Sequence, residues 1–176
     1  MSDQKIIMVV GPDMCGKTQI AQALAKDQNI GYFKATSEHE TYLSMKERFL
    51  LQLQHADPRT LDLLKQIGFS AVFDRAYPCE FAYSRVFKRK TDNNKLVMLD
   101  REYAKLGAKI ILCRRTSYKG IVDDIDPHIT STILEDLDRA YNEFCGWTRC
   151  DVLQLNVDDE NIQRELTDIK NWLLLK

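Results

Sequence analysis

The sequence has no apolar run long enough to cross a membrane and no start typical of a secreted protein. Its longest aliphatic run, Ile6 to Val10, falls far short of the ~20 residues that span a bilayer. The polar segment Met1 to Gln4 lacks the basic residues that begin a signal peptide. We therefore expect a cytoplasmic protein that has no membrane partner.

Cysteine and histidine are too scattered to predict a disulfide framework or a zinc site. The five cysteines include no C-x-x-C pair, and none of the three histidines lies at zinc-finger spacing. We interpret the cysteines as reduced thiols. The formal net charge of −1 excludes a whole-molecule field that would attract nucleic acid, although a local basic patch could still do so.

Five short apolar segments predict strands buried in a mainly parallel sheet. Segments with helical periodicity separate them, and the chain has no Gly/Pro/Ser-rich linker and no internal repeat. This alternation predicts one α/β domain, residues 1–176. Ligands of such sheets bind beyond the carboxyl ends of the strands, so the functional residues should lie there. The expected strands span residues 5–10, 30–34, 70–73, 109–113 and 151–157.

Capping residues predict where several helices begin and end. Asp92 is placed to cap a helix that stops at Gly107, and Asp126 followed by Pro127 predicts a helix that stops at Gly146. Asp158 or Asp159 is expected to cap the last helix. Other helices are expected around Ile20–Ala25, over Tyr42–Leu53 and before Gly68.

A complete G-x-x-x-x-G-K-[ST] motif follows the first expected strand. In this phosphate-binding loop, backbone N–H groups and a helix N-terminus surround phosphate oxygens. Lys17 can reach the β and γ phosphates, and the Thr18 hydroxyl can ligate Mg²⁺. The motif therefore predicts ATP and Mg²⁺ as donor and cofactor. The loop residues expected to contact ATP are Gly11, Met14, Cys15, Gly16, Lys17 and Thr18.

Companion residues favour a kinase over other enzymes that use this loop. A GTPase needs a guanine-reading N-K-x-D segment, and the sequence has none. A hydrolytic ATPase usually ends an apolar strand with Asp-Glu, whereas this strand ends Phe73-Asp74-Arg75. An arginine beside that carboxylate suits phosphoryl transfer to a bound acceptor, because cationic donors stabilise the moving charge. The same pair also fits a salt bridge at the end of a strand.

The segment Asp74–Ser84 resembles the Asp-Arg-Tyr segment of thymidylate kinases, and Ala82-Tyr83 falls where those enzymes carry an Ala-Tyr or Ala-Phe pair. Asp13 occupies the position of their acidic loop residue. The resemblance implies a P-loop kinase fold, a three-layer sandwich with a five-stranded parallel sheet. It also implies a small-molecule acceptor, a thymidine-like deoxynucleoside monophosphate.

The same resemblance implies roles for individual residues. Asp13 would hold the sugar hydroxyl of the acceptor, and Arg75 would hold the transferred phosphoryl group. Thr18 and Asp74 would form the metal site, Asp74 acting through water. The expected catalytic residues are Asp13, Lys17, Asp74, Arg75 and Arg115, and the expected acceptor-binding residues are Asp13, Arg75, Tyr77, Glu80, Phe81 and Tyr83.

Three features depart from thymidylate kinases. Val10 stands where they usually carry an acidic residue, and Lys46–Gln52 does not reproduce their Phe-x-x-x-Arg motif for the acceptor base. The lid, about residues 114–126, is short. We expect its cations Arg114, Arg115 and Lys119 to close onto ATP and exclude water, although the segment also fits an ordinary exposed loop.

A basic cluster directly after the acceptor segment leaves other interpretations open. Arg85, Lys88, Arg89 and Lys90 suit either the solvated face of a helix or a rim that contacts DNA phosphates. The Tyr-Pro-x-Glu-aromatic segment also resembles virus-encoded kinases of 5-hydroxymethyluracil in DNA, which would act in the host cytoplasm. A third hypothesis is an inactive nucleotide-binding regulatory protein. A homodimer is compatible with each of these hypotheses.

Overall fold

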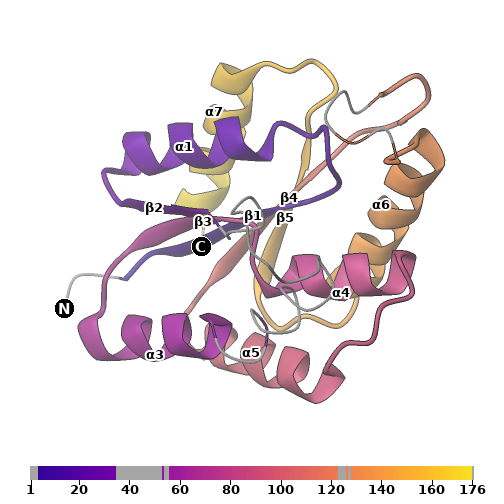
Figure 1. Ribbon diagram of the computed structural model, residues 1–176. Helices are drawn as coiled ribbons and strands as arrows, with labels where there is room; N and C mark the ends of the chain where they lie inside the picture. The colour runs from indigo at the N-terminus through magenta and orange to yellow at the C-terminus, as the bar shows by residue number, and fades with distance from the viewer. Residues whose placement is uncertain (1–3, 35–52, 54–55, 123–125, 127, 176) are drawn as a thin grey trace.

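The computed structural model describes residues 4–34, 53, 56–122, 126 and 128–175. Within these ranges the chain forms a five-stranded sheet of order β2-β3-β1-β4-β5, in which every neighbouring pair is parallel (Figure 1). All five predicted strands are confirmed. The strands are β1 Ile6–Val10, β2 Gly31–Lys34, β3 Ala71–Asp74, β4 Lys109–Arg114 and β5 Asp151–Asn156.

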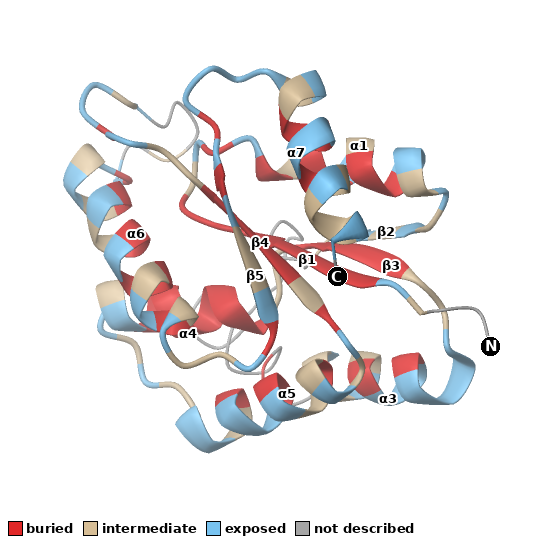
Figure 2. Cartoon of the chain, turned by 180° about the vertical axis from the view of Figure 1, so that it is seen from behind, coloured by how far each residue is buried: buried red, intermediate tan, exposed pale blue. Residues whose placement is uncertain are grey.

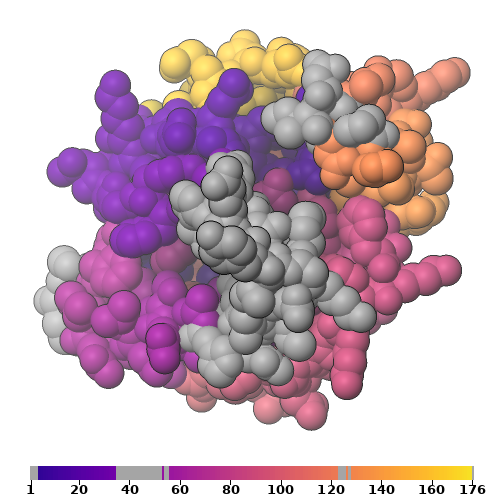
Figure 3. All heavy atoms as spheres, in the orientation of Figure 1, coloured from indigo at the N-terminus to yellow at the C-terminus, as the bar shows by residue number. Residues whose placement is uncertain are grey.

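Six helices of the described residues cover both faces of the sheet. α1 and α7 pack on one face, while α3, α4, α5 and α6 pack on the other (Figures 1 and 2). In the space-filling view of Figure 3, α1 and α7 lie along one side of the molecule and α3 along the opposite side. The expected three-layer α/β sandwich is confirmed. The helices are α1 Lys17–Gln28, α3 Asp57–Ile67, α4 Tyr77–Val86, α5 Asn93–Lys105, α6 Ser131–Cys145 and α7 Ile162–Leu174.

The central strand β1 is buried on both faces because its side chains alternate between the two helical layers. Ile6, Met8 and Val10 pack with residues of α3, α4, α5 and α6. Ile7 and Val9 pack with residues of α1 and α7. A strand with no solvated face has a continuous apolar sequence, which is why this strand was recognisable from its Ile and Val residues.

The predicted boundaries of α5 are confirmed, and α3 ends as expected. The Asp92 carboxylate accepts a hydrogen bond from the backbone N–H of Lys95 and caps α5. Gly107 follows this helix with a φ of 71°, and Gly68 follows α3 with a φ of 69°. Glycine is favoured at both positions because other residues are strained in the left-handed region.

The N-caps predicted for α6 and α7 are wrong. Thr130 caps α6, because its hydroxyl accepts from the backbone N–H three residues later, while Asp126 accepts from the N–H two residues later in the preceding turn. Asn161 caps α7 in the same way as Thr130 caps α6. Asp158 and Asp159 instead bond side chains of the lid start and of α7.

Some predictions fall on residues that the structure does not describe. The helix expected over Tyr42–Leu53 lies outside the described ranges except for Leu53, which is buried. Pro127 also lies outside them. None of the helices in the described ranges combines the length and apolar character needed to span a membrane.

The start of the phosphate-binding loop is in tight contact with the neighbouring strand. Gly11 has a φ of 143°, and a Cβ atom added there would lie 2.1 Å from the carbonyl oxygen of Cys113 in β4. No real Cβ contact is this short, so any larger residue must push β1 and β4 apart. The first glycine of the motif is therefore required by packing as well as by backbone conformation.

We predict that Gly11→Ala destabilises the fold by about 3 kcal/mol, because it combines a forbidden φ with a steric clash against backbone. Gly107→Ala is the matched control, since Gly107 has a positive φ of 71° and nothing within 4 Å of an added Cβ. This control should lose only about 1 kcal/mol. Urea unfolding measures both changes, and equal losses would contradict the steric argument.

Candidate active site

The motif residues form a loop between β1 and α1, at the carboxyl edge of the sheet. Met14 and Gly16 have φ angles of 62° and 63°, which curl the loop back before the helix begins. Gly16 is the N-cap of α1 and supplies no side-chain hydrogen bond, so no side chain of the cap occupies the first N–H groups. Such free N–H groups at a helix N-terminus attract anions.

Lys17 places a positive charge over this loop. Its side chain is only 5% exposed, and the ammonium donates a hydrogen bond to the carbonyl oxygen of Pro12. The same ammonium lies 3.7 Å from Oδ1 of Asp13. The predicted phosphate-binding lysine therefore lies within the loop, beside the predicted acceptor carboxylate.

Asp74 lies at the end of β3, where the parallel register pairs it with Val9 of β1. Its side chain is fully buried. Its Oδ2 accepts hydrogen bonds from the Thr18 hydroxyl at 2.7 Å and from the Tyr32 phenol at 3.0 Å. Its Oδ1 has no hydrogen-bond partner among the described residues.

This arrangement fits a magnesium site. A buried carboxylate oxygen without a donor is costly unless a cation or an ordered water compensates it. Thr18 donates its only proton to Asp74, so the lone pairs of its hydroxyl oxygen stay available to a metal. Mg²⁺ typically uses one or two protein oxygens together with phosphate and water, so a full cage of protein ligands is not required.

Asp13, Arg75 and Tyr83 form a second cluster beside the loop. Arg75 Nη2 donates to Asp13 Oδ1 at 2.6 Å, and the Tyr83 hydroxyl donates to Asp13 Oδ2 at 2.6 Å. Both oxygens of the Asp13 carboxylate are thus engaged. Arg75 has a φ of 70°, which is strained for a non-glycine residue and is held by a backbone hydrogen bond to Val9.

The protonation states of this cluster follow from its neighbours. Burial alone would raise the pKa of Asp13, but the charges of Lys17 and Arg75 and the Tyr83 hydrogen bond together lower it. Burial raises the pKa of Tyr83 well above its usual value, so its hydroxyl keeps the proton that it donates. Asp13 is therefore an anion, and Arg75 and Lys17 are its cations.

Arg115 also lies at the loop, on the side of β4. Its guanidinium donates to the carbonyl oxygen of Met14 from Nε at 3.1 Å and from Nη2 at 3.0 Å, and it pairs with Glu160 at 2.6 Å. The Cys15 side chain is buried in the core, with its sulfur 3.6 Å from the hydroxyl of Tyr118. The sequence predicted both residues near ATP. In the structure the Arg115 guanidinium bonds the backbone of the loop, and the Cys15 side chain lies beside Tyr118.

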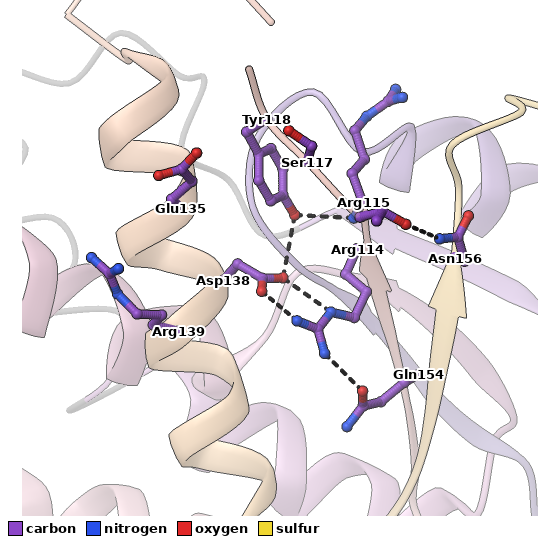
Figure 4. Close-up of a pocket in the computed structure, with 10 residues that line it drawn as sticks. Arg114, Arg115, Ser117, Tyr118, Glu135, Asp138, Arg139, Gln154 and Asn156 are labelled. Carbon is purple, nitrogen blue, oxygen red and sulfur yellow. Dashed lines mark hydrogen bonds and ion pairs between the residues drawn. The ribbon is translucent and has the colours of Figure 1, made fainter.

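Among the described residues, no hydrogen bond or ion pair joins the other two lid cations, Arg114 and Lys119, to the loop. Arg114 points toward α6, where it pairs with Asp138 and donates to Asn142 and Gln154 (Figure 4). Arg114, Asp138 and Gln154 line a polar cavity of about 650 Å³ between α6 and the ends of β4 and β5. The guanidinium of Arg114 is thus engaged by side chains of α6 and β5, and its contact with ATP stays a prediction. Lys119 is exposed.

Three of the expected acceptor-binding side chains point elsewhere. Tyr77 is 1% exposed, and its hydroxyl donates to Asp100 at 2.8 Å in the core. Phe81 packs its ring against aromatic rings of the α6 region. Glu80 is buried in an ion pair with Arg89. Tyr77 and Phe81 therefore face the core and Glu80 its cation, and the acceptor contacts expected of these three residues stay predictions.

The basic cluster is partly neutralised within the protein. Arg89 pairs with Glu80 at 2.9 Å. Arg85 pairs with Glu143 at 3.1 Å and its guanidinium lies 4.2 Å from the centre of the Phe81 ring. Lys88 and Lys90 are exposed. Two of the four cations expected to contact DNA therefore have carboxylate partners.

Sequence reasoning missed two tyrosines of the site. Tyr32 reaches Asp74 from the edge strand β2, and Tyr118 connects the loop to α6 through hydrogen bonds to Cys15 and Asp138. Tyr32 could have been found only from the strand order, because its contact with Asp74 depends on β2 lying next to β3.

We predict that Asp13→Asn lowers stability at pH 7 by about 2 kcal/mol, because it removes the anion that partners the buried Lys17 and the half-buried Arg75. A lowered folded-state pKa means that Asp13 contributes stability above its ordinary pKa of 3.8 and loses it as the pH falls through the folded value. The deficit of the variant should therefore shrink toward pH 3 in urea unfolding. The exposed control Asp62→Asn should show no deficit, and a pH-independent deficit would contradict the argument.

No protein-family model and no curated protein matches the sequence. The fold, in contrast, is similar to solved structures, several of which are kinases. YorR of Bacillus subtilis, in complex with phosphorylated GDP, gives a TM-score of 0.69 at 18% identity over 97% of this chain and 96% of that one. Deoxyadenosine kinase from M. mycoides gives 0.63 at 20% identity over 98% and 100%. Thymidylate kinase from Candida albicans gives 0.67 at 13% identity over 98% and 92%. These likenesses establish the P-loop kinase fold.

Proposed function

We propose that the chain is an ATP-dependent nucleotide kinase whose acceptor is a thymidine-like deoxynucleoside monophosphate. The observation that carries this proposal is the meeting of Lys17, Asp13 and Arg75. Asp13 Oδ1 lies 2.6 Å from Arg75 and 3.7 Å from Lys17, so a donor-side cation and an acceptor-side cation share one carboxylate. A site built this way holds two phosphate-bearing ligands next to each other.

On the donor side, the loop N–H groups and Lys17 would bind the β and γ phosphates of ATP. Thr18 would hold Mg²⁺ directly and Asp74 would hold it through water. A metal held by these two residues would supply positive charge to the phosphates. Arg115, fixed on the Met14 carbonyl, maintains the shape of the loop from the side of β4.

On the acceptor side, Asp13 would accept a hydrogen bond from a hydroxyl of the acceptor, and Arg75 would donate to the transferred phosphoryl group. In the ligand-free protein these two side chains pair with each other, and Tyr83 satisfies the other Asp13 oxygen. Acceptor binding would exchange these partners without leaving a bare charge. Phosphoryl transfer relies mainly on such positioning and charge stabilisation.

The fold neighbours support a nucleotide acceptor without choosing its base. One is a thymidylate kinase, one a deoxyadenosine kinase, and one holds phosphorylated GDP. The resemblance of Asp74–Ser84 to thymidylate kinases favours dTMP as the first acceptor. An acceptor panel must therefore contain dTMP, dAMP, deoxyadenosine and GMP, together with hydroxymethyluracil-containing DNA.

The test is transfer of labelled phosphate from ATP to this panel by the wild-type protein. We expect dTMP to be labelled fastest. Labelling of the DNA alone would replace the proposal with a DNA-base kinase, and no labelling of any acceptor, with nucleotide still bound, would indicate a regulatory protein. Either result would overturn a deoxynucleotide kinase.

We predict that Lys17→Met lowers kcat/KM by on the order of 10²-fold or more, because it removes the positive charge at the β and γ phosphates. Lys26→Met is the matched control, since Lys26 is an exposed lysine of the same helix. Steady-state kinetics with matched circular dichroism checks both variants. Wild-type turnover in folded Lys17→Met would contradict the role of the loop.

We predict that Arg75→Ala lowers kcat by about 10²-fold with a smaller change in the KM for ATP, because Arg75 acts on charge that grows in the transition state. Arg101→Ala, an exposed arginine of α5, should match the wild type. If Arg75→Ala raised only the KM for ATP, Arg75 would belong to the donor site instead.

A further inference from the structure

The Tyr32 hydroxyl, on the edge strand β2, donates a hydrogen bond to Asp74 in the candidate metal site. It approaches Asp74 from the edge of the sheet, while Thr18 approaches from α1. The two donors come from different elements on either side of β3 and meet at the same oxygen, Oδ2. Each hydrogen bond alone would restrain the plane of the carboxylate less than the two together do.

Two donors on one oxygen fix the plane of the carboxylate and the direction in which its other oxygen faces the metal or the water bound to it. Oδ2 accepts both hydrogen bonds, at donor–acceptor distances of 2.7 Å and 3.0 Å, and Oδ1 accepts none from the described residues. If Tyr32 were removed, Thr18 alone would hold this oxygen, and the plane of the carboxylate could tilt so that the other oxygen no longer faces the metal site. The Tyr32 hydroxyl therefore selects a single orientation of Asp74.

Because Asp74 is buried, the orientation of its carboxylate determines which groups can compensate its charge. The side chain is fully buried, and no lysine or arginine in the described ranges lies within ion-pair distance of it. A buried carboxylate in this situation depends on hydrogen bonds and on a bound cation for its charge. Residues that orient a metal-binding carboxylate commonly change metal affinity by 10- to 100-fold, roughly, when they are removed.

We propose that Tyr32 is a positioning residue that orients Asp74 toward the magnesium that accompanies the donor nucleotide. This inference rests on the proposed function, because it assumes a metal–nucleotide complex at the loop. It assigns no contact between Tyr32 and substrate. Its consequence is that the hydroxyl matters for metal binding and not for nucleotide binding in the absence of metal.

The test compares the wild type with Tyr32→Phe, which keeps the ring that packs against the α1 layer and removes only the hydroxyl. Binding of Mn²⁺ is measured by electron paramagnetic resonance in the presence of ADP, and binding of ADP is measured separately in EDTA. We expect Tyr32→Phe to bind Mn²⁺ about 10-fold more weakly. Its ADP affinity in EDTA should match the wild type, while its thermal midpoint should fall by roughly a few degrees, because the buried carboxylate of Asp74 loses one of its two donors.

The matched control is Tyr103→Phe, which removes a buried phenol hydroxyl on the opposite face of the sheet and should leave Mn²⁺ binding unchanged. Equal Mn²⁺ affinity in Tyr32→Phe and wild type would overturn the role of Tyr32 and leave the donor site intact. A parallel loss of metal-free ADP binding would show a structural role and also overturn it. Failure of the wild type to bind Mn²⁺ with ADP would overturn both this inference and the proposed donor site.

Discussion

The pairing of Val9 with Asp74 between β1 and β3 determines where the charged groups of the site lie. Because the two strands are parallel and in register, both end at the same edge of the sheet. The phosphate-binding loop leaves one strand at the point where Asp74-Arg75 leaves the other, and Arg75 N–H bonds the carbonyl of Val9. Segments about 60 residues apart in sequence thus meet through backbone hydrogen bonds, before any side-chain contact is considered.

This geometry gathers opposite charges that satisfy each other without a ligand. Asp13 balances Lys17 and Arg75, and Thr18 and Tyr32 stabilise Asp74 by hydrogen bonds. Nucleotide binding would then replace one set of charge partners with another, which costs less than burying an unpaired phosphate or guanidinium. The exception is Asp74 Oδ1, and the lack of a described donor there is the clearest structural indication of a cation.

The sequence predicted those features that depend on local pattern. The β1 strand, the loop motif and the cap at Asp92 each arise from residues close together in the chain, and all three predictions agree with the structure. The misplaced side chains depend on distant partners instead, whereas the caps Thr130 and Asn161 are local signals that the sequence prediction passed over. Arg114 turns toward α6 because Asp138 lies there, and Tyr77 turns into the core because Asp100 accepts a hydrogen bond from its hydroxyl. Neither partner is visible in the local pattern around the residue concerned.

The position of α4 explains why its aromatic and charged residues divide among different roles. Nearly every residue from Tyr77 to Ser84 is buried, so this helix has no solvated face on which a uniform binding surface could form. Tyr83 points to the site and Phe81 to the core, while Glu80 requires a cation because it is buried. Arg89 supplies that cation. A run of basic residues that suggests nucleic-acid binding in the sequence is thus partly the counter-charge of a buried helix, and its positive potential toward solvent is correspondingly smaller.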